Sequence, residues 1–114
     1  MNTIAIIIPI YNRLEITKQG LISLTKALDY YNVDSTKFNY EIVIVDDGST
    51  DGSGDWIRLN YPKIHVLRSD GNLWWSGCIN MGVKYGIDKM CADYVLLWND
   101  DLFLDKKYFS ILSD

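Results

Sequence analysis

The sequence predicts an α/β domain in which a parallel sheet carries helices on both faces. Short apolar runs, typical of strands buried on both sides, alternate along the chain with segments whose apolar residues recur at helical spacing. Such alternation implies right-handed crossovers and therefore parallel strands. Polar residues follow directly after three of the apolar runs. We expect these polar groups to meet at the carboxyl edge of the sheet, where open sheets of this kind bind ligands.

The first half of the chain predicts two strands and two helices. Residues 3–9, TIAIIIP, form a β-branched run that suits a buried strand. A helix should begin at Leu14, with apolar residues three or four positions apart: Leu21, Leu24, Leu28 and Tyr31. Residues 32–39 are polar and predict a loop, and residues 40–47, YEIVIVDD, predict a second buried strand. After the turn-forming residues 48–55, a short helix around Trp56 should stop before Pro62.

The second half repeats the alternation. Residues 63–69, KIHVLRS, predict a third strand, and residues 70–75, DGNLWW, predict a loop. Ser76 is a candidate N-cap for a helix with these inward residues: Ile79, Val83, Ile87 and Met90. Residues 94–98, YVLLW, predict the fourth strand. Asp105 is a candidate cap for a last helix that contains Tyr108, Phe109, Ile111 and Leu112.

Length and charge exclude several classes of protein. The 114 residues predict a single domain with its own core, and the net charge of −4 argues against general binding to nucleic acid or to anionic membranes. Apolar runs fall far short of the ~20 residues of a membrane span, and the first residues lack the pattern of a signal peptide. Two cysteines cannot form a disulfide framework. We therefore expect a cytoplasmic location, at most peripheral to the inner face of the membrane.

Adjacent carboxylates follow two of the predicted strands. Asp46 and Asp47 end the second strand, and Asn99, Asp100 and Asp101 follow the fourth. Paired acids on a core strand repel each other and lose hydration, so a ligand has to compensate for them. A carboxylate at the second strand could accept a hydrogen bond from a ligand's imide or amide N–H, or hold a cation. The pair after the fourth strand suits Mg²⁺ or Mn²⁺, which bind carboxylate oxygens together with substrate phosphates; the alternative is a turn with two solvated acids.

The segment DGNLWWSGCINMG adds a third element of the expected site. Its loop precedes a helix N-terminus, which favours anions. Gly77 would let a ligand approach the backbone, and Asn80 lies one turn into the helix. We expect one of Trp74 and Trp75 to be buried and the other to line a pocket. The only histidine, His65, is interpreted as a structural residue rather than a catalytic one.

Four segments, IAIIIPIYNR, EIVIVDDGSTDGS, GNLWWSGCINMG and YVLLWNDD, resemble the family 2 glycosyltransferases in order and approximate spacing. This resemblance implies the Rossmann-like GT-A fold of nucleotide-diphospho-sugar transferases and an inverting, metal-dependent enzyme. The GNL segment is most similar to the rhamnosyltransferase-like branch, which acts in cell-surface polysaccharide synthesis. The implied partners are a nucleoside-diphosphate sugar, with UDP or dTDP favoured, and a sugar or glycolipid acceptor.

The resemblance also implies residue roles. Pro9 to Asn12 would line the nucleotide, with Tyr11 against the base. Asp47 would pair with the N–H of the base while Asp46 supports the loop. The segment around Gly77 and Asn80 would lie near the ribose and diphosphate. Asn99, Asp100 and Asp101 match the DXD motif, with Asp100 near the ribose or donor sugar and Asp101 as the Mn²⁺ or Mg²⁺ ligand.

Two departures from the family pattern concern single residues of the expected site. The first position of the DXD motif is Asn99, and Ile79 stands where many members have arginine. The asparagine leaves Asp101 as the best metal ligand. Without the arginine, contacts with the phosphates would depend more on the metal and the backbone.

The length of the chain also departs from the family pattern. The sequence stops at Asp114, about one helix after the DXD strand, and the resemblance places the catalytic base of these enzymes further along the chain, beyond Asp114. We therefore expect a fragment or truncated gene product that binds the donor, lacks the catalytic base, transfers no sugar and self-associates through exposed edges. A nucleotide-binding module without turnover and a Mg²⁺-dependent phosphoryl-transfer domain stay open as alternatives.

Overall fold

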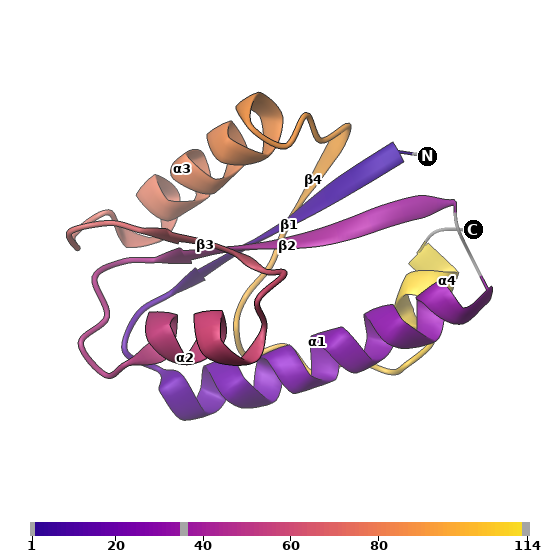
Figure 1. The fold of residues 1–114 in the computed structure, drawn as a ribbon, viewed down its shortest axis with the longest axis horizontal. Coiled ribbons are helices and arrows are strands. Elements are labelled where there is room, and N and C mark those ends of the chain that lie inside the picture. Colours follow the sequence, from indigo (N-terminus) through magenta and orange to yellow (C-terminus); the bar gives the residue numbers. More distant parts are fainter. Residues whose placement is uncertain (1, 35–36, 113–114) are drawn as a thin grey trace.

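The computed structural model describes residues 2–34 and 37–112, which form alternating strands and helices (Figure 1). The elements in chain order are β1 (Asn2–Ile10), α1 (Leu14–Asp34), β2 (Phe38–Asp46), α2 (Ser53–Asn60), β3 (His65–Arg68), α3 (Trp74–Asp88), β4 (Tyr94–Leu97) and α4 (Tyr108–Leu112). The predicted α/β class is confirmed.

The four described strands form one parallel sheet in the order β3-β2-β1-β4. The register pairs Ile6 of β1 with Ile42 of β2 on one side and with Leu96 of β4 on the other. Helix α3 covers one face, and α1, α2 and α4 cover the other (Figure 1). Because β1, β2 and β4 are parallel, their carboxyl ends lie at the same edge of the sheet.

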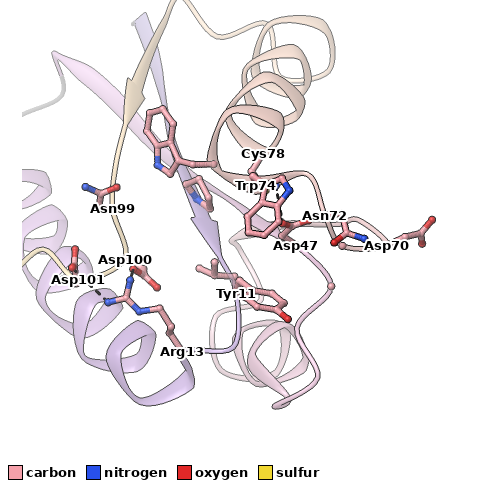
Figure 2. Close-up of a pocket in the computed structure, with 15 residues that line it drawn as sticks. Tyr11, Arg13, Asp47, Asp70, Asn72, Trp74, Cys78, Asn99, Asp100 and Asp101 are labelled. Carbon is pink, nitrogen blue, oxygen red and sulfur yellow. Dashed lines mark hydrogen bonds and ion pairs between the residues drawn. The ribbon is translucent and has the colours of Figure 1, made fainter.

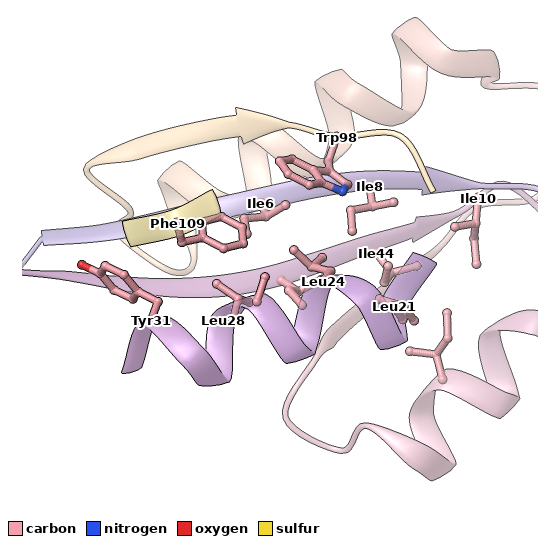
Figure 3. Packing of buried hydrophobic residues seen from close by; sticks show 13 residues of the cluster. Ile6, Ile8, Ile10, Leu21, Leu24, Leu28, Tyr31, Ile44, Trp98 and Phe109 are labelled. Atoms are coloured by element: carbon pink, nitrogen blue, oxygen red, sulfur yellow. The ribbon is translucent and has the colours of Figure 1, made fainter. Parts of the chain in front are cut away.

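The larger hydrophobic cluster lies between the sheet and α1 (Figure 3). Alternate residues of β1 point into it, and α1 contributes its predicted apolar stripe: Leu21, Leu24, Leu28 and Tyr31. Phe109 of α4 is fully buried and stacks on Trp98, with ring centroids 6.0 Å apart. Burying a side chain of this size stabilises the fold by roughly 1.5–3 kcal/mol. The segment after β4 is therefore anchored to the core rather than loosely attached.

Several predicted boundaries are wrong, and β3 is shorter than predicted, since it begins at His65 and ends at Arg68. Helix α1 continues through Asp34, so residues 32–34 of the predicted loop are helical, and β2 already begins at Phe38. Positions 35–36 of that loop lie outside the described residues. Helix α2 begins at Ser53, within the predicted turn. Residues 32–34 and 53–55 are weak helix formers, so their state is set by their surroundings. Phe38 favours strands, although it stands among polar residues.

The predicted N-cap Ser76 is also wrong, because α3 begins at Trp74 with Leu73 at the cap position. The backbone N–H groups of Leu73 and Trp74 are bound by the carboxylate of Asp47, at the end of β2, so no local cap is needed. At the other predicted cap, Asp105 Oδ1 accepts the N–H of Lys107 at 2.8 Å, and the Asp105 carbonyl oxygen accepts the N–H of Tyr108, the first residue of α4, at 3.0 Å.

Helix α4 is the last described element, and it ends at Leu112. Asp114, beyond which the family resemblance places the catalytic base, lies outside the described residues. The location of the base beyond Asp114 therefore stays a prediction.

Strand β4 lies at the edge of the described sheet and exposes apolar side chains there. Tyr94 and Leu97 are about half exposed. An uncovered edge strand with apolar side chains can pair with another chain. Self-association through this edge stays a prediction.

Candidate functional site

A pocket of about 720 Å³ opens at the carboxyl edge of the sheet (Figure 2). Its walls come from the ends of β1, β2 and β4, the loop before α3 and the first turn of α3. Six residues of the expected nucleotide and DXD sites line it: Pro9, Tyr11, Asp47, Asn99, Asp100 and Asp101. In Figure 2, Asp47, Asn72 and Trp74 lie on one side, and Arg13, Asp100 and Asp101 lie on the other. The expected convergence of strand ends is thus present in the structure.

Three other predicted residues do not line the pocket. Asn12 has a positive φ of 48°, and its side-chain oxygen accepts the N–H of Thr50 at 2.7 Å. A Cβ at Gly77 would meet the Cβ of Leu73 at 2.9 Å, so this glycine lets the first turn of α3 pack closely. Asn80 is exposed on α3. Asn12 therefore joins the end of β1 to the loop after β2, and any ligand contact by these residues stays a prediction.

Asp47 joins β2 to the start of α3. Its Oδ1 accepts the Ser69 hydroxyl at 2.7 Å and the Leu73 N–H at 3.1 Å, and its Oδ2 accepts the Trp74 N–H at 3.0 Å. Burial acts to raise the pKa of Asp47, but these hydrogen bonds outweigh it and hold the pKa below its usual value. A carboxylate can accept about four hydrogen bonds, so Oδ2 keeps room for a ligand donor.

Asp46 and Asp51 have structural roles in the same loop. Asp46 is completely buried, pairs with Arg68 at 3.3 Å and accepts the Ser49 N–H at 2.9 Å. Asp51 accepts the N–H of Leu14 at the start of α1 and the N–H of Ser53 at the start of α2, each at 3.0 Å. The support role expected for Asp46 agrees with these contacts. Asp51 caps two helices at once, which fixes the loop against the end of β1.

Asp100 and Asp101 end β4 in different surroundings. The Asp100 side chain is buried, and its two oxygens contact Arg13 at 3.2 Å and the Thr17 hydroxyl at 3.1 Å. Burial raises the pKa of Asp100, although Arg13 and Thr17 act in the opposite direction. The Asp101 side chain is 49% exposed and contacts Arg13 at 3.5 Å. Asp100 is held in place while Asp101 faces the solvent.

A divalent cation fits Asp101 better than Asp100. Hard cations prefer carboxylate oxygens, and Mg²⁺ is often held by one or two carboxylates together with substrate phosphates. In the described part of the chain, His, Cys, Asp and Glu form no group of three or more suited to a metal. A cation here would therefore depend on Asp101 and on oxygens supplied by a ligand.

Two tryptophans form an aromatic wall of the pocket. Trp74 is 76% exposed and Trp75 is 51% exposed, and both line the pocket. The expectation that one of them is buried is wrong, because Asp47 starts α3 at Trp74 and leaves both side chains outside the core. Trp74 has a φ of 58°, an unusual conformation for a large residue, and Asp47 stabilises it through the Trp74 N–H.

Sequence reasoning assigned no role to four residues that line the pocket: Arg13, Asp70, Asn72 and Cys78. The sequence marks Arg13 only as a polar residue at a strand end, and its pairing with Asp100 spans most of the chain. The Asp70 side chain extends away from Asp100 and Asp101 in Figure 2. Burial, with Asp47 and Asp46 nearby, raises the pKa of Cys78 to about 11, so this thiol is a poor nucleophile.

His65 is structural, as predicted. Its Nδ1 lies 2.9 Å from the Tyr85 hydroxyl and its Nε2 lies 3.2 Å from a Glu41 carboxylate oxygen. His65 does not line the pocket. Both ring nitrogens therefore have partners away from the site.

An open parallel sheet with acids and aromatic side chains at its carboxyl edge is the architecture of a ligand-binding α/β domain. The model of glycosyl transferase family 2 matches residues 5–113, so the chain belongs to this family. Among the described residues, no helix is long and apolar enough to cross a membrane.

Similar proteins include glycosyltransferases from distant organisms. The chain is 36% identical to the low-salt glycan biosynthesis hexosyltransferase Agl10 of Haloferax volcanii over 59% of this chain and 21% of that protein. It is 30% identical to the dolichyl-phosphate β-glucosyltransferase of Saccharomyces cerevisiae over 74% of this chain and 28% of that protein. The chain thus spans less than a third of the length of these relatives.

Solved structures share the fold. S. aureus TarS 1–349 matches 99% of this chain and 31% of its own chain, with a TM-score of 0.72 and 25% identity. The mannosyltransferase PcManGT of Pyrobaculum calidifontis, solved with GDP-Man and Mn²⁺, matches 94% of this chain and 30% of its own, with a TM-score of 0.74 and 17% identity. The expected GT-A fold is confirmed.

Proposed function

We propose that this chain binds the nucleoside diphosphate of a sugar donor, as part of an inverting glycosyltransferase that transfers the sugar to a hydroxyl acceptor. The proposal depends on one observation: Asp47, which follows β2, lines the same pocket as Asp100 and Asp101, which follow β4. Family membership supports sugar transfer as the reaction. A phosphoryl-transfer domain is less well supported, because such domains usually place an acid after the first strand, and β1 is followed by Tyr11, Asn12 and Arg13.

The nucleotide base would lie between Tyr11 and the α3 side of the pocket. Tyr11 is exposed at the end of β1 and offers its ring for stacking. Asp47 Oδ2 would accept the N3–H of uracil or thymine with its remaining lone pair, which favours UDP or dTDP over GDP. Among solved structures of this fold, TarS has been determined with UDP and with UDP-GlcNAc. Gly77 and Asn80, at the start of α3, would lie near the ribose and diphosphate.

Asp101 would hold Mn²⁺ or Mg²⁺, and Asp100 would orient the loop that carries it and approach the ribose or donor sugar. When bound, the cation supplies positive charge that stabilises the leaving diphosphate. Asp101 is suited to this because half of its side chain is exposed and it lines the pocket. Asp100 is less suited because Arg13 and Thr17 occupy its oxygens.

The acceptor's general base is not among the pocket carboxylates in this proposal. Asp47 is assigned to the nucleotide base, Asp100 is bound by Arg13 and Thr17, and Asp101 belongs to the diphosphate. Asp70 extends away from both β4 acids. We therefore infer that these residues alone bind donor without transferring it. The acceptor would be a sugar or glycolipid of a cell-surface polysaccharide, as the rhamnosyltransferase-like GNL segment suggests.

The test is to titrate the chain with UDP, dTDP and GDP by calorimetry, with and without Mn²⁺. We expect UDP or dTDP to bind more tightly than GDP, and Mn²⁺ to strengthen binding. Exclusive binding of GDP would contradict the role of Asp47, and binding unaffected by Mn²⁺ would contradict the role of Asp101.

A further inference from the structure

The first turns of α1 hold the acidic loop that follows β4. Gly20 has no side chain, and a Cβ there would collide with the backbone carbonyl oxygen of Asp100. One turn earlier, Thr17 is buried and donates its hydroxyl to Asp100 Oδ2 at 3.1 Å. Asp100 is therefore fixed to α1 through both its backbone and its side chain.

Arg13 contacts both acids from the segment just before α1. Its Nη1 lies 3.2 Å from Asp100 Oδ1 and its Nη2 lies 3.5 Å from Asp101 Oδ2 (Figure 2). One guanidinium group thus offsets the repulsion between two adjacent carboxylates, which is the electrostatic effect that a bound cation would have. The contact with Asp101 is the longer of the two, and it is also the more exposed.

We propose that Arg13 is a positioning residue that holds Asp101 in the absence of a cation, and that a divalent cation must displace it from Asp101 to bind. This inference rests on the proposed role of Asp101 as the metal ligand. A cation on Asp101 and the guanidinium repel each other and compete for the same carboxylate. The Arg13 contact with Asp100 is retained, because Asp100 is buried and also bound to Thr17.

Competition between Arg13 and the cation predicts that removing Arg13 raises the affinity for the cation. Removing a residue that merely supports the loop would weaken cation binding, whereas removing a competitor strengthens it. Arg13→Gln takes away the positive charge and should raise the affinity for Mn²⁺, measured with a saturating concentration of UDP, by about three- to tenfold. Arg13→Lys keeps the charge but has a single ammonium group that cannot contact both acids equally, so its gain should be smaller.

Arg68 provides a matched control at another strand end. Its side chain is 49% exposed against 43% for Arg13, and it pairs with one buried acid, Asp46, at 3.3 Å. Arg68 does not line the pocket. Arg68→Gln removes the same charge from the domain, so it measures the general electrostatic effect on Mn²⁺ binding, which should be close to nil.

Because the cation would depend on ligand oxygens as well as on Asp101, the experiment measures Mn²⁺ binding to the 114-residue chain in the presence of UDP, with UDP alone as the blank. Electron paramagnetic resonance is used for wild type, Arg13→Gln, Arg13→Lys, Arg68→Gln and Asp101→Asn. Circular dichroism establishes that each variant is folded, and if Arg13→Gln does not fold, the gain of Arg13→Lys decides. Arg13→Gln should bind Mn²⁺ more tightly than wild type and Arg68→Gln, and Asp101→Asn should lose binding.

The outcomes separate the two proposals. If Asp101→Asn loses Mn²⁺ but Arg13→Gln binds no more tightly than wild type, the competition is wrong and the metal role of Asp101 stands. An equal gain in Arg68→Gln also overturns the competition, because the effect is then not local. If Asp101→Asn binds Mn²⁺ as wild type does, or if neither wild type nor Arg13→Gln binds it, the metal site itself is wrong.

Discussion

The carboxylate of Asp47, at the end of β2, accepts the backbone N–H of Trp74, at the start of α3, at a distance of 3.0 Å. This bond caps a helix from a residue 27 positions earlier in the chain. It sets the first residue of α3 and places an exposed indole on the pocket wall. One side chain thus links the helix boundary to the shape of the site.

The pKa of Asp47 leads to a prediction about acid stability. Because its pKa in the folded state lies below the usual value of 3.8, the unfolded chain takes up this proton first as the pH falls. The stabilisation is therefore complete above about pH 4–5 and is lost as the pH falls through the folded pKa. Asp47→Asn should lower the free energy of unfolding by about 1–2 kcal/mol at pH 7, and this deficit should shrink in acid. Urea unfolding at pH 7 and pH 3 measures both values.

Asp100 serves as a control, because its pKa shift changes stability with pH in the opposite direction to that of Asp47. Its pKa is raised in the folded state, so the folded chain binds this proton more tightly and protonation favours folding as the pH falls. In the same urea series, Asp100→Asn should therefore lose stability in acid more steeply than wild type. If the free energies of unfolding of wild type, Asp47→Asn and Asp100→Asn change with pH in the same way, both pKa assignments are contradicted.

Asp47 is also the proposed partner of the nucleotide base. Asp47→Ala removes a charge-assisted hydrogen bond worth roughly 1.5–3 kcal/mol, so UDP or dTDP should bind about ten- to a hundredfold more weakly. Since Trp74 and Trp75 line the pocket, their fluorescence on titration with UDP provides the measurement.

Asp51→Asn is the matched control for this substitution. Asp51 also has a lowered pKa and also binds helix N–H groups, but it does not line the pocket. Its substitution should cost stability and leave the affinity for UDP within about twofold of wild type. Equal losses of affinity in Asp47→Ala and Asp51→Asn would show that loop stability, rather than a contact with the base, governs binding.

Gly20→Ala tests the contact between α1 and the acidic loop. Alanine normally favours a helix over glycine by about 1 kcal/mol, but here the added Cβ would collide with the Asp100 backbone. We expect a net loss of about 1–3 kcal/mol in the free energy of unfolding, together with weaker Mn²⁺ binding.

Gly86→Ala is the control for the loss of stability expected in Gly20→Ala. Gly86 also lies in a helix, and its added Cβ would meet the Ala5 side chain at 3.2 Å, a tight contact that a small shift can relieve. Its stability, measured by thermal unfolding, should stay within about 1 kcal/mol of wild type. If both variants were equally stable, α1 would not hold the acidic loop as closely as proposed.

The sequence predicts the sheet and the location of the site for a physical reason. Strands buried on both faces have a continuous apolar pattern, and parallel strands end at one edge, so the sequence predicts that Asp47 and Asp101 lie at the same edge. Ser76 was the wrong cap because a side chain distant in sequence supplies the real one. Arg13 was missed as a partner of Asp100 because no local pattern indicates which acid a strand-end arginine will contact.

The last prediction is that the 114-residue chain alone binds donor but transfers no sugar. Inverting transfer needs a base against the acceptor hydroxyl, on the side opposite the leaving diphosphate. Of the pocket carboxylates, Asp47 is assigned to the base, Asp100 is bound by Arg13 and Thr17, and Asp101 lies beside Arg13 where the diphosphate is proposed to bind. Asp70 extends away from both β4 acids. Incubation with labelled nucleotide-sugars and a panel of sugar and glycolipid acceptors should therefore give no acceptor-dependent product. The yeast dolichyl-phosphate β-glucosyltransferase, assayed in parallel, controls for the method; turnover by the chain at a comparable rate would place the base among these residues and refute the assignment.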